Sequence, residues 1–162
     1  SMKKLFPILF ISLFIFSCKE KDEEQGVDMT NNNPKVVGVG GIFFKSDNPE
    51  KIKKWYQDNL GIITDQYGYM FKSRNLDNPE EINYLQWSPF NKDTEYFNPS
   101  KKEFMINYRV QNIEDLVINL REKGITIVDK IEEYEEYGKF VHILDPEGNK
   151  IELWEPPSEK IK

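Results

Sequence analysis

The sequence predicts an α+β fold of two similar modules, each made of a strand, a capped helix and three further strands (βαβββ). An Asn that can cap a helix precedes each predicted helix, Asn48 in the first module and Asn112 in the second. Gly61 and Gly124 then end the two helices. The matched landmarks recur at a nearly constant spacing, which indicates an internal repeat rather than a simple alternation of helices and strands.

The first module is predicted over residues 36–90. Its first strand, residues 36–44, is apolar but contains three glycines, and glycine inside a strand marks a bulge or the close approach of another group. Pro49 at the first helical position favours the helix that follows. Short aromatic or alternating runs at residues 62–72 and 82–88 predict the later strands. The apolar stripe expected to bury the helix is Ile52, Trp55, Tyr56 and Leu60.

The two modules are predicted to be joined by a linker, residues 91–102, in which turn-prone residues are frequent. The second module, residues 103–157, opens with a strand at residues 104–110. Further strands are predicted after its helix, at residues 125–131 and 140–144.

A hairpin and a last strand end the second module. Residues 145–149 (Asp-Pro-Glu-Gly-Asn) have the composition of a tight turn, because Pro presets φ and Gly adopts φ > 0. Ile151 and Leu153 then alternate with Glu152, a period of two residues. The apolar pair is expected on a packed layer, so Glu152 is expected on the opposite face, toward solvent or a cleft.

The run Asp-Pro-Glu-Gly-Asn-x-Ile-Glu-Leu at residues 145–153 resembles the last hairpin of the vicinal oxygen chelate superfamily. That superfamily contains glyoxalase I, extradiol dioxygenases, methylmalonyl-CoA epimerase and the bleomycin and fosfomycin resistance proteins, and paired βαβββ modules are its architecture. The resemblance covers residues 36–156. It implies a glyoxalase-like domain, residues 36–157, with two curved sheets facing each other around a cleft.

In the metal enzymes of that superfamily, each module offers ligands from its first and last strands, and the first-strand ligand is usually a His seven residues before the helix cap. In this sequence the matching first-strand positions hold Gly41 and Met105, and the last-strand positions hold Gln86 and Glu152. Glu152 is the one strong ligand for Zn, Ni, Mg or Fe, because glycine has no donor, thioether sulfur suits soft metals and amide oxygen is neutral. These departures predict no metal and no other cofactor, with a weakly held divalent ion as the alternative.

Strand alternation predicts which other side chains line the cleft. Asn107 and Arg109 share a strand face with Met105, so all three are expected to point the same way. The planar guanidinium of Arg109 suits a carboxylate or phosphate, or else makes a structural salt bridge to Glu152 or a neighbouring acid. The remaining predicted ligand-binding residues are Phe43 and Lys45, which share a face with Gly41, and Tyr84, which shares one with Gln86.

His142 is the only histidine, and it precedes the last hairpin. Antiparallel pairing is able to place it across from Glu152, where the two would form a general-base pair, so Glu152 and His142 are the candidate catalytic residues. A hydrogen-bonded core histidine and an exposed one are the alternatives. If Glu152 faces the cleft, Glu152→Gln is expected to change ligand binding more than stability.

The N-terminus predicts export from the cytoplasm. Residues 1–17 combine a basic start with a short apolar run, which is typical of a signal peptide. The Ser-Cys pair that ends at Cys18 resembles a bacterial lipobox, although Ile15 and Phe16 depart from its usual residues. The resemblance implies a lipidated Cys18, a flexible polar tether over residues 18–35, and a lipid-anchored protein of the bacterial cell envelope. An ordinary signal peptide is the alternative.

The formal net charge of −6 argues against a nucleic-acid partner. The leading prediction is a metal-free lipoprotein that binds a small molecule in the cleft between its modules. The drug-sequestering resistance proteins are the nearest functional analogy, and they bind across a dimer, so a homodimer stays open. The first alternative is a glyoxalase-like lyase or isomerase, and the second is a cell-surface interaction module with a vestigial cleft.

Overall fold

The computed structural model describes residues 32–76 and 78–157. The predicted signal peptide, Cys18 and most of the predicted tether lie outside the described residues. Among the described residues, no helix is long and apolar enough to cross a membrane.

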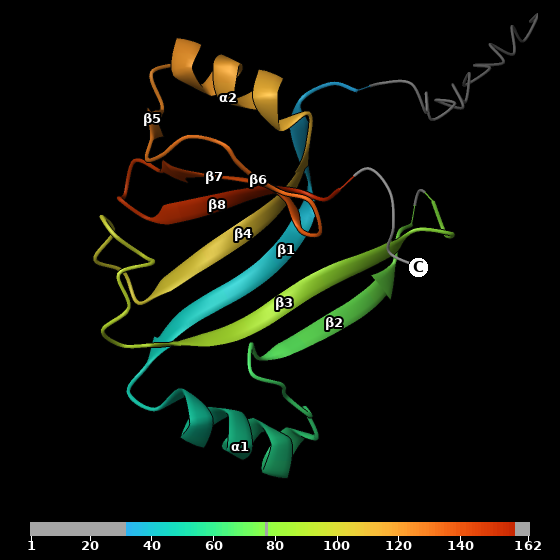
Figure 1. Ribbon diagram of the computed structural model, residues 1–162, viewed down its shortest axis with the longest axis vertical. Helices are drawn as coiled ribbons and strands as arrows, with labels where there is room; N and C mark the ends of the chain where they lie inside the picture. Colours follow the sequence, from blue (N-terminus) through green and yellow to red (C-terminus); the bar gives the residue numbers. More distant parts are fainter. Residues whose placement is uncertain (1–31, 77, 158–162) are drawn as a thin grey trace, which may run out of the picture.

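The described residues form one eight-stranded mixed sheet and two helices (Figure 1). The strand order is β2-β3-β1-β4-β8-β7-β5. The short strand β6 pairs with the N-terminal end of β7, residues 138–140. The strands are β1 (Lys35–Ser46), β2 (Tyr69–Arg74), β3 (Ile82–Asn91), β4 (Phe104–Gln111), β5 (Thr126–Ile127), β6 (Glu132–Tyr134), β7 (Gly138–Leu144) and β8 (Lys150–Glu155), and the helices are α1 (Pro49–Leu60) and α2 (Ile113–Glu122).

The two predicted modules meet at the centre of this sheet. In the first module β1 pairs with β3 in parallel, and in the second β4 pairs with β8 in parallel. The first strands of the modules, β1 and β4, are antiparallel neighbours, as a pseudo-twofold axis between the modules requires. The α+β prediction is confirmed, but one continuous sheet replaces the two facing sheets.

The first module has one strand fewer than predicted, because residues 62–68 are not a strand. The carboxylate of Asp65 accepts hydrogen bonds from the backbone N–H groups of Tyr67 and Gly68, at 2.7 and 2.9 Å. Gly68 has a φ of +127°, and a Cβ there would lie 1.9 Å from the carbonyl oxygen of Trp87. The polar turn and the close approach to β3 therefore end the apolar run before β2 begins.

Both helices cover the same face of the sheet, which we call the helix face. Helix α2 packs Ile113 and Val117 against the cluster that includes Val110, Val141 and Leu153. Helix α1 packs Tyr56 against Trp87, with ring centroids 4.6 Å apart. Trp87 shares the row of Ile42, Ile106 and Ile151 across the sheet, which places both helices on one side. The opposite face, which carries Gly41, Asn107 and Glu152, is called the open face.

The predicted caps are confirmed at both helices. The Asn48 side chain accepts from the N–H of Lys51 at 2.9 Å, and the Asn112 side chain accepts from the N–H of Asp115 at 3.3 Å. Gly61 and Gly124 have φ values of +69° and +74°, a conformation that glycine adopts without strain. In addition, the carboxylate of Glu155 accepts from the N–H groups of Asn112 and Ile113, which ties the last strand to the start of α2.

The apolar stripe predicted for α1 is only partly buried. Trp55 and Leu60 are 51% and 58% exposed, whereas Lys53 is 6% exposed. The ammonium group of Lys53 donates to the carbonyl of Asp65 at 3.1 Å and pairs with Glu50 at 2.7 Å. The part of the α1 surface that is buried against the sheet is therefore narrower than the predicted apolar stripe.

The predicted linker lies on the open face rather than looping away from it. Phe97 is fully buried and packs with Phe43, Met105 and Phe90. The Ser100 hydroxyl donates to the carbonyl of Gly148 at 2.7 Å, which fixes the linker to the last hairpin. One end of the open face is therefore covered by the chain itself.

Candidate functional site

Three rows of side chains cross the open face, each set by strand register. The middle row, called the polar row, joins β3, β1, β4, β8 and β7 in that order. Cα partners along it are Gly41 with Gln86, Gly41 with Asn107, Asn107 with Glu152, and Glu152 with His142. The predicted placement of His142 across from Glu152 is confirmed.

The register places Asn107, rather than Met105, in the second-module position equivalent to Gly41. Gly41 pairs with Gln86 of the parallel last strand, and Asn107 pairs with Glu152 in the same way. Asn48 follows Gly41 by seven positions, whereas Asn112 follows Asn107 by five, so counting back seven from each cap overshoots in the second module. The family position predicted at Met105 is therefore corrected to Asn107.

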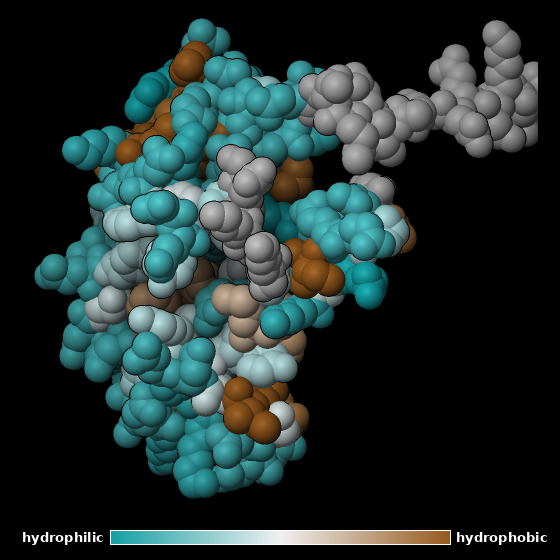
Figure 2. Space-filling model, turned by 45° about the vertical axis from the view of Figure 1, so that its right-hand side comes forward, coloured by the Kyte–Doolittle hydropathy of each residue, from teal (hydrophilic) through white to brown (hydrophobic). Residues whose placement is uncertain are grey.

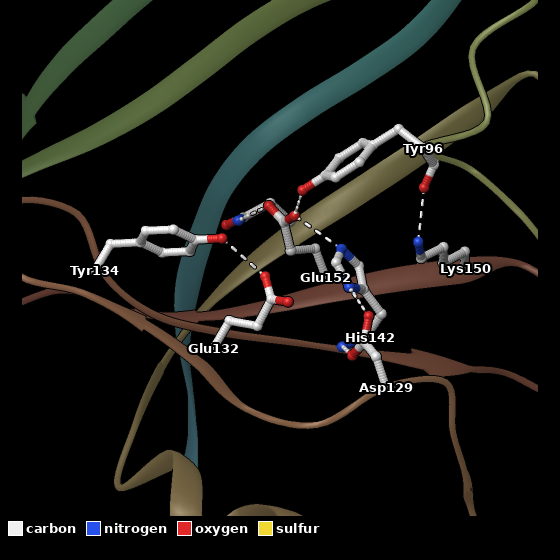
Figure 3. Close-up of polar contacts among 8 residues, drawn as sticks. Tyr96, Asp129, Glu132, Tyr134, His142, Lys150 and Glu152 are labelled. Carbon is white, nitrogen blue, oxygen red and sulfur yellow. Dashed lines mark hydrogen bonds and ion pairs between the residues drawn. The ribbon is translucent and has the colours of Figure 1, made fainter.

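Glu152 is the centre of a buried hydrogen-bond network (Figure 3). It is 2% exposed. Its Oε1 accepts from Nδ2 of Asn107 at 2.6 Å, and its Oε2 accepts from the hydroxyl of Tyr96. Nε2 of His142 lies 2.9 Å from Oε2. Both carboxylate oxygens are therefore engaged by protein groups.

His142 links Glu152 to a second carboxylate, that of Asp129. Nδ1 of His142 lies 2.6 Å from Oδ2 of Asp129, and the backbone N–H of His142 donates to Oδ1 at 2.8 Å. The imidazole of His142 therefore lies between two carboxylates, with Asp129 at Nδ1 and Glu152 at Nε2.

Tyr96 enters the network from the linker and is fixed by Lys150. The ammonium group of Lys150 donates to the carbonyl of Tyr96 at 2.6 Å and lies 5.1 Å from the ring centroid (Figure 3). Burial lowers the pKa of Lys150. Burial, and then the charge of Glu152, raise the pKa of Tyr96, so its hydroxyl stays protonated and donates to Glu152.

The pKa of Glu152 is lowered in the folded protein. Burial alone would raise the pKa, but hydrogen bonds from His142, Tyr96 and Asn107 outweigh that effect. A carboxyl whose folded pKa lies below its unfolded value of 4.5 contributes stability above that value and loses it as the pH falls through the folded pKa.

We therefore expect the free energy of unfolding to decrease as the pH is lowered below 4.5, the unfolded value for Glu152. Urea unfolding at a series of pH values measures this decrease. Glu152→Ala removes the titrating group, so its pH dependence should be shallower than that of the wild type. Parallel pH curves for the two proteins would show that other carboxylates carry the effect.

The second row, called the apolar row, consists of Phe43 and Met105, which are Cα partners on β1 and β4. Both were predicted to bind ligand, but they are 8% and 0% exposed and are covered by Phe97. Lys45 also turns to the linker, with its Nζ 5.6 Å from the Phe97 ring. The absent side chain of Gly41 does not widen a cleft, since the Phe43 ring fills that space, 2.6 Å from where a Cβ would lie.

The third row, called the arginine row, consists of Gly38, Arg109, Trp154 and Phe140, which are successive Cα partners. Arg109 is 6% exposed. Its ion partner is Glu81, at 3.8 Å between Nη1 and Oε1, rather than Glu152. The glycines of β1 make this row compact, because a Cβ on Gly40 would lie 2.7 Å from Cε3 of Trp154.

The other predicted ligand-binding residues lie beside these rows. Nε2 of Gln86 lies within hydrogen-bond distance of the Ser88 hydroxyl, at 3.1 Å. Tyr84 is partly buried on the same strand, and the ammonium group of Lys72 lies 5.6 Å from its ring centroid. The first-module members of the polar row, Gly41 and Gln86, are therefore uncharged, and the ammonium group of Lys72 lies beside them on the open face.

Sequence reasoning missed Tyr96 and Asp129. Tyr96 lies in the predicted linker. The adjacent aromatic pair Tyr96-Phe97 is unusual in such a polar stretch, and it indicates that part of the linker packs on the rest of the protein. Asp129 lies in a segment predicted as strand. Its contact with His142 depends on how that segment lies beside β7. Local sequence patterns do not fix such pairing.

The side chains of the polar row do not make a metal-ligand set. Gly41 offers no donor, Gln86 and Asn107 offer neutral amides, and both oxygens of Glu152 already accept hydrogen bonds from protein groups. Divalent zinc sites normally have three or four strong ligands. Within the described ranges, no group of three or more His, Cys, Asp or Glu residues is placed to hold a metal ion.

The comparisons identify the family. The model of the Glyoxalase/Bleomycin resistance protein/Dioxygenase superfamily matches residues 42–153, so the chain belongs to this superfamily. No curated protein matches the chain significantly.

Solved structures with the same fold include methylmalonyl-CoA epimerases. A variant of the Streptomyces coelicolor enzyme in complex with 2-nitronate-propionyl-CoA has a TM-score of 0.55 at 13% identity, covering 79% of this chain and 100% of that chain. A methylmalonyl-CoA epimerase in complex with methylmalonyl-CoA and NH4+ has a TM-score of 0.54 at 13% identity, covering 76% and 97%. At these identities the similarity shows the fold.

Proposed function

We propose that the protein binds a small organic molecule on the open face, beside the polar and arginine rows, without using a metal ion. One observation carries this proposal. Among the described residues, three buried side-chain atoms have no hydrogen-bond partner: Oδ1 of Asn83 on the helix face, and Oδ1 of Asn107 and Nε of Arg109 on the open face. Buried polar atoms are normally paired, so two unpaired atoms on neighbouring rows of one face support a ligand that supplies their partners.

The state of Glu152 supports binding without metal. A carboxylate that ligates a metal must offer it a lone pair, whereas the oxygens of Glu152 face Asn107, Tyr96 and His142. A metal ion would have to displace these donors and leave the buried groups of Asn107 and His142 unpaired, at roughly 1–3 kcal/mol for each.

An acid–base isomerase or lyase is the second candidate, and the chain of Asp129, His142 and Glu152 favours it. A carboxylate backed by a histidine and a further carboxylate is suited to accept and return a proton. Substrate would reach Glu152 only after Tyr96 leaves its oxygen, because Glu152 is 2% exposed. Asn107 and Arg109 are buried to a similar extent, at 3% and 6% exposed, so their unpaired atoms, rather than easier access, favour binding over catalysis.

An interaction module is the third candidate. The face shown in Figure 2 is mostly hydrophilic, with hydrophobic side chains in separate patches. Large contiguous apolar areas mark protein–protein interfaces, and this face does not show one.

The indole N–H signals of the three tryptophans provide a test of ligand binding. Trp154 lies on the open face and donates to the carbonyl of Tyr137 at 2.7 Å, whereas Trp55 is exposed on α1 and Trp87 lies on the helix face. In a fragment screen by nuclear magnetic resonance, we expect binding compounds to shift the Trp154 signal, with EDTA present, and to leave Trp55 unchanged. Hits that shift only Trp55, or that require Zn²⁺, would contradict the proposal. Lactoylglutathione lyase activity on adding Zn²⁺ or Ni²⁺ would favour the enzyme instead.

We also propose that Cys18 anchors the protein to a membrane of the bacterial cell envelope. The apolar run followed by Ser17 and Cys18 supports this placement. Cys18→Ser is expected to move the protein from the membrane fraction to the soluble fraction in a bacterial host, with an unchanged melting temperature. A stable variant that still sediments with membranes would show that another segment or a partner is the anchor.

A further inference from the structure

We infer that the ligand of the open face carries a carboxylate that binds Arg109 and, at its other end, a hydrogen-bond donor that binds Asn107. This inference rests on the proposed function and names the chemical class of its ligand. It starts from what each of the two buried side chains lacks.

Arg109 is a buried cation whose positive charge is only weakly balanced by a neighbouring acid. Its guanidinium has five N–H donors, and Nε has no partner among the described residues. Its ion pair with Glu81 is 3.8 Å long, and the Glu81 side chain is 46% exposed, so solvent weakens the pair. A buried charge needs a close and well-aligned partner, which a carboxylate supplies through two parallel hydrogen bonds.

The surroundings of Arg109 favour a planar ligand group. A Cβ at Gly38 would lie 3.4 Å from Nη2, so the guanidinium lies against the bare backbone of β1 on one side. Trp154 is its Cα partner on the other side and stacks with Phe140 at an interplanar angle of 16°. The guanidinium therefore lies flat against β1, and its planar fork matches the two oxygens of a carboxylate.

Asn107, by contrast, has an unpaired hydrogen-bond acceptor and therefore lacks a donor. Its Nδ2 donates to Glu152, which fixes the amide and leaves Oδ1 as an acceptor that no described residue meets. Asn107 and Arg109 are two positions apart on one strand face, a separation of about 6.6 Å along the strand. A ligand that satisfies both needs a carboxylate and a donor separated by a comparable length.

The linker covers one side of this region. Phe97 covers the apolar row and Tyr96 reaches Glu152 from the same side. On the arginine-row side, Oδ1 of Asn107 lies against β1, because a Cβ at Gly40 would be 2.2 Å from this oxygen and 2.7 Å from Cε3 of Trp154. A ligand donor that binds Oδ1 is therefore expected to displace the Trp154 ring.

Three probes test the inference on the full-length protein. 4-Hydroxybenzoate has both groups, benzoate has the carboxylate alone, and 4-hydroxybenzamide has the donor without the charge. By isothermal titration and the Trp154 indole signal, we expect 4-hydroxybenzoate to bind more tightly than benzoate and at least about tenfold more tightly than the amide. Because this comparison uses the wild-type protein, its result does not depend on whether a variant folds.

Variants of Arg109 provide the second arm. Arg109→Gln should weaken the two carboxylates to the level of the amide, and Arg109→Lys should be intermediate because it keeps the charge but loses the fork. Arg121→Gln removes an exposed arginine from α2 on the helix face and should bind as the wild type does. Melting curves confirm that each variant is folded.

Equal binding of 4-hydroxybenzoate and 4-hydroxybenzamide to the wild type would overturn the inference, as would carboxylate binding that survives in a folded Arg109→Gln protein. Failure of all three probes at millimolar concentration would also overturn it. If other, uncharged compounds still shift Trp154, the proposed function stands and only the ligand class is wrong. If no compound in the fragment screen shifts Trp154, the proposed function itself fails.

Discussion

Glu152→Ala is expected to lower the free energy of unfolding by about 3–5 kcal/mol, the largest loss among substitutions on the open face. Glu152 is 2% exposed, and its removal leaves Asn107, Tyr96 and His142 without their shared acceptor. Asn107 and His142 are buried, so each loses a hydrogen bond that water does not replace, whereas Tyr96 is 40% exposed. Urea unfolding of both proteins at neutral pH measures the difference.

Glu147→Ala is the matched control, because Glu147 is an exposed glutamate of the adjoining turn. We expect a change within roughly 0.5 kcal/mol there. Glu152→Gln keeps the shape but turns an amide N–H₂ toward groups that themselves donate, so it too should be destabilising. The expectation from strand alternation alone, that this substitution affects binding more than stability, is therefore revised. Equal stability of the wild type and Glu152→Ala would show that the network does not stabilise the fold.

Phe97→Ala is expected to lower the free energy of unfolding by about 3–5 kcal/mol, the range for large-to-small changes at buried aromatic residues. Phe97 is fully buried in the linker and packs on Phe43, Met105 and Phe90. Its loss leaves a cavity over the apolar row, and it also loosens Tyr96, the preceding residue in the chain. Urea unfolding measures the stability, and the rate of amide exchange in the linker reports the loosening.

Phe104→Ala is the control for this experiment, since Phe104 is 46% exposed at the start of β4. It should cost much less than Phe97→Ala. A small effect at both positions would mean that the linker is a plain connection, as its polar composition predicts.

The sequence was sufficient for those features that local chemistry determines. Asn48, Gly61 and Asn112 act within one helical turn, so their roles follow from their neighbours along the chain. Strand alternation also places Asn107 and Arg109 on one face, because a period of two does not depend on the strand's partners.

Features that depend on distant pairing could not be derived in the same way. Equal spacing from the helix caps gave Met105 where register gives Asn107, because the connection into α2 is shorter than the one into α1. Tyr96 and Asp129 reach His142 and Glu152 only through the path of the linker and the pairing of β7. Residues 62–68 are not a strand because the Asp65 side chain stabilises a turn there. The pattern of apolar residues does not predict this turn.

The meeting of β1 and β4 at the centre of the sheet gives the polar row two halves that are equivalent in position but not in chemistry. Gly41 and Gln86 of the first half are matched by Asn107 and Glu152 of the second. Two identical halves would accept a ligand in either of two poses related by the twofold axis, whereas here one half is neutral and the other is charged. The chemical difference between the two halves therefore removes this degeneracy, so a molecule bound as proposed is expected to have one preferred orientation.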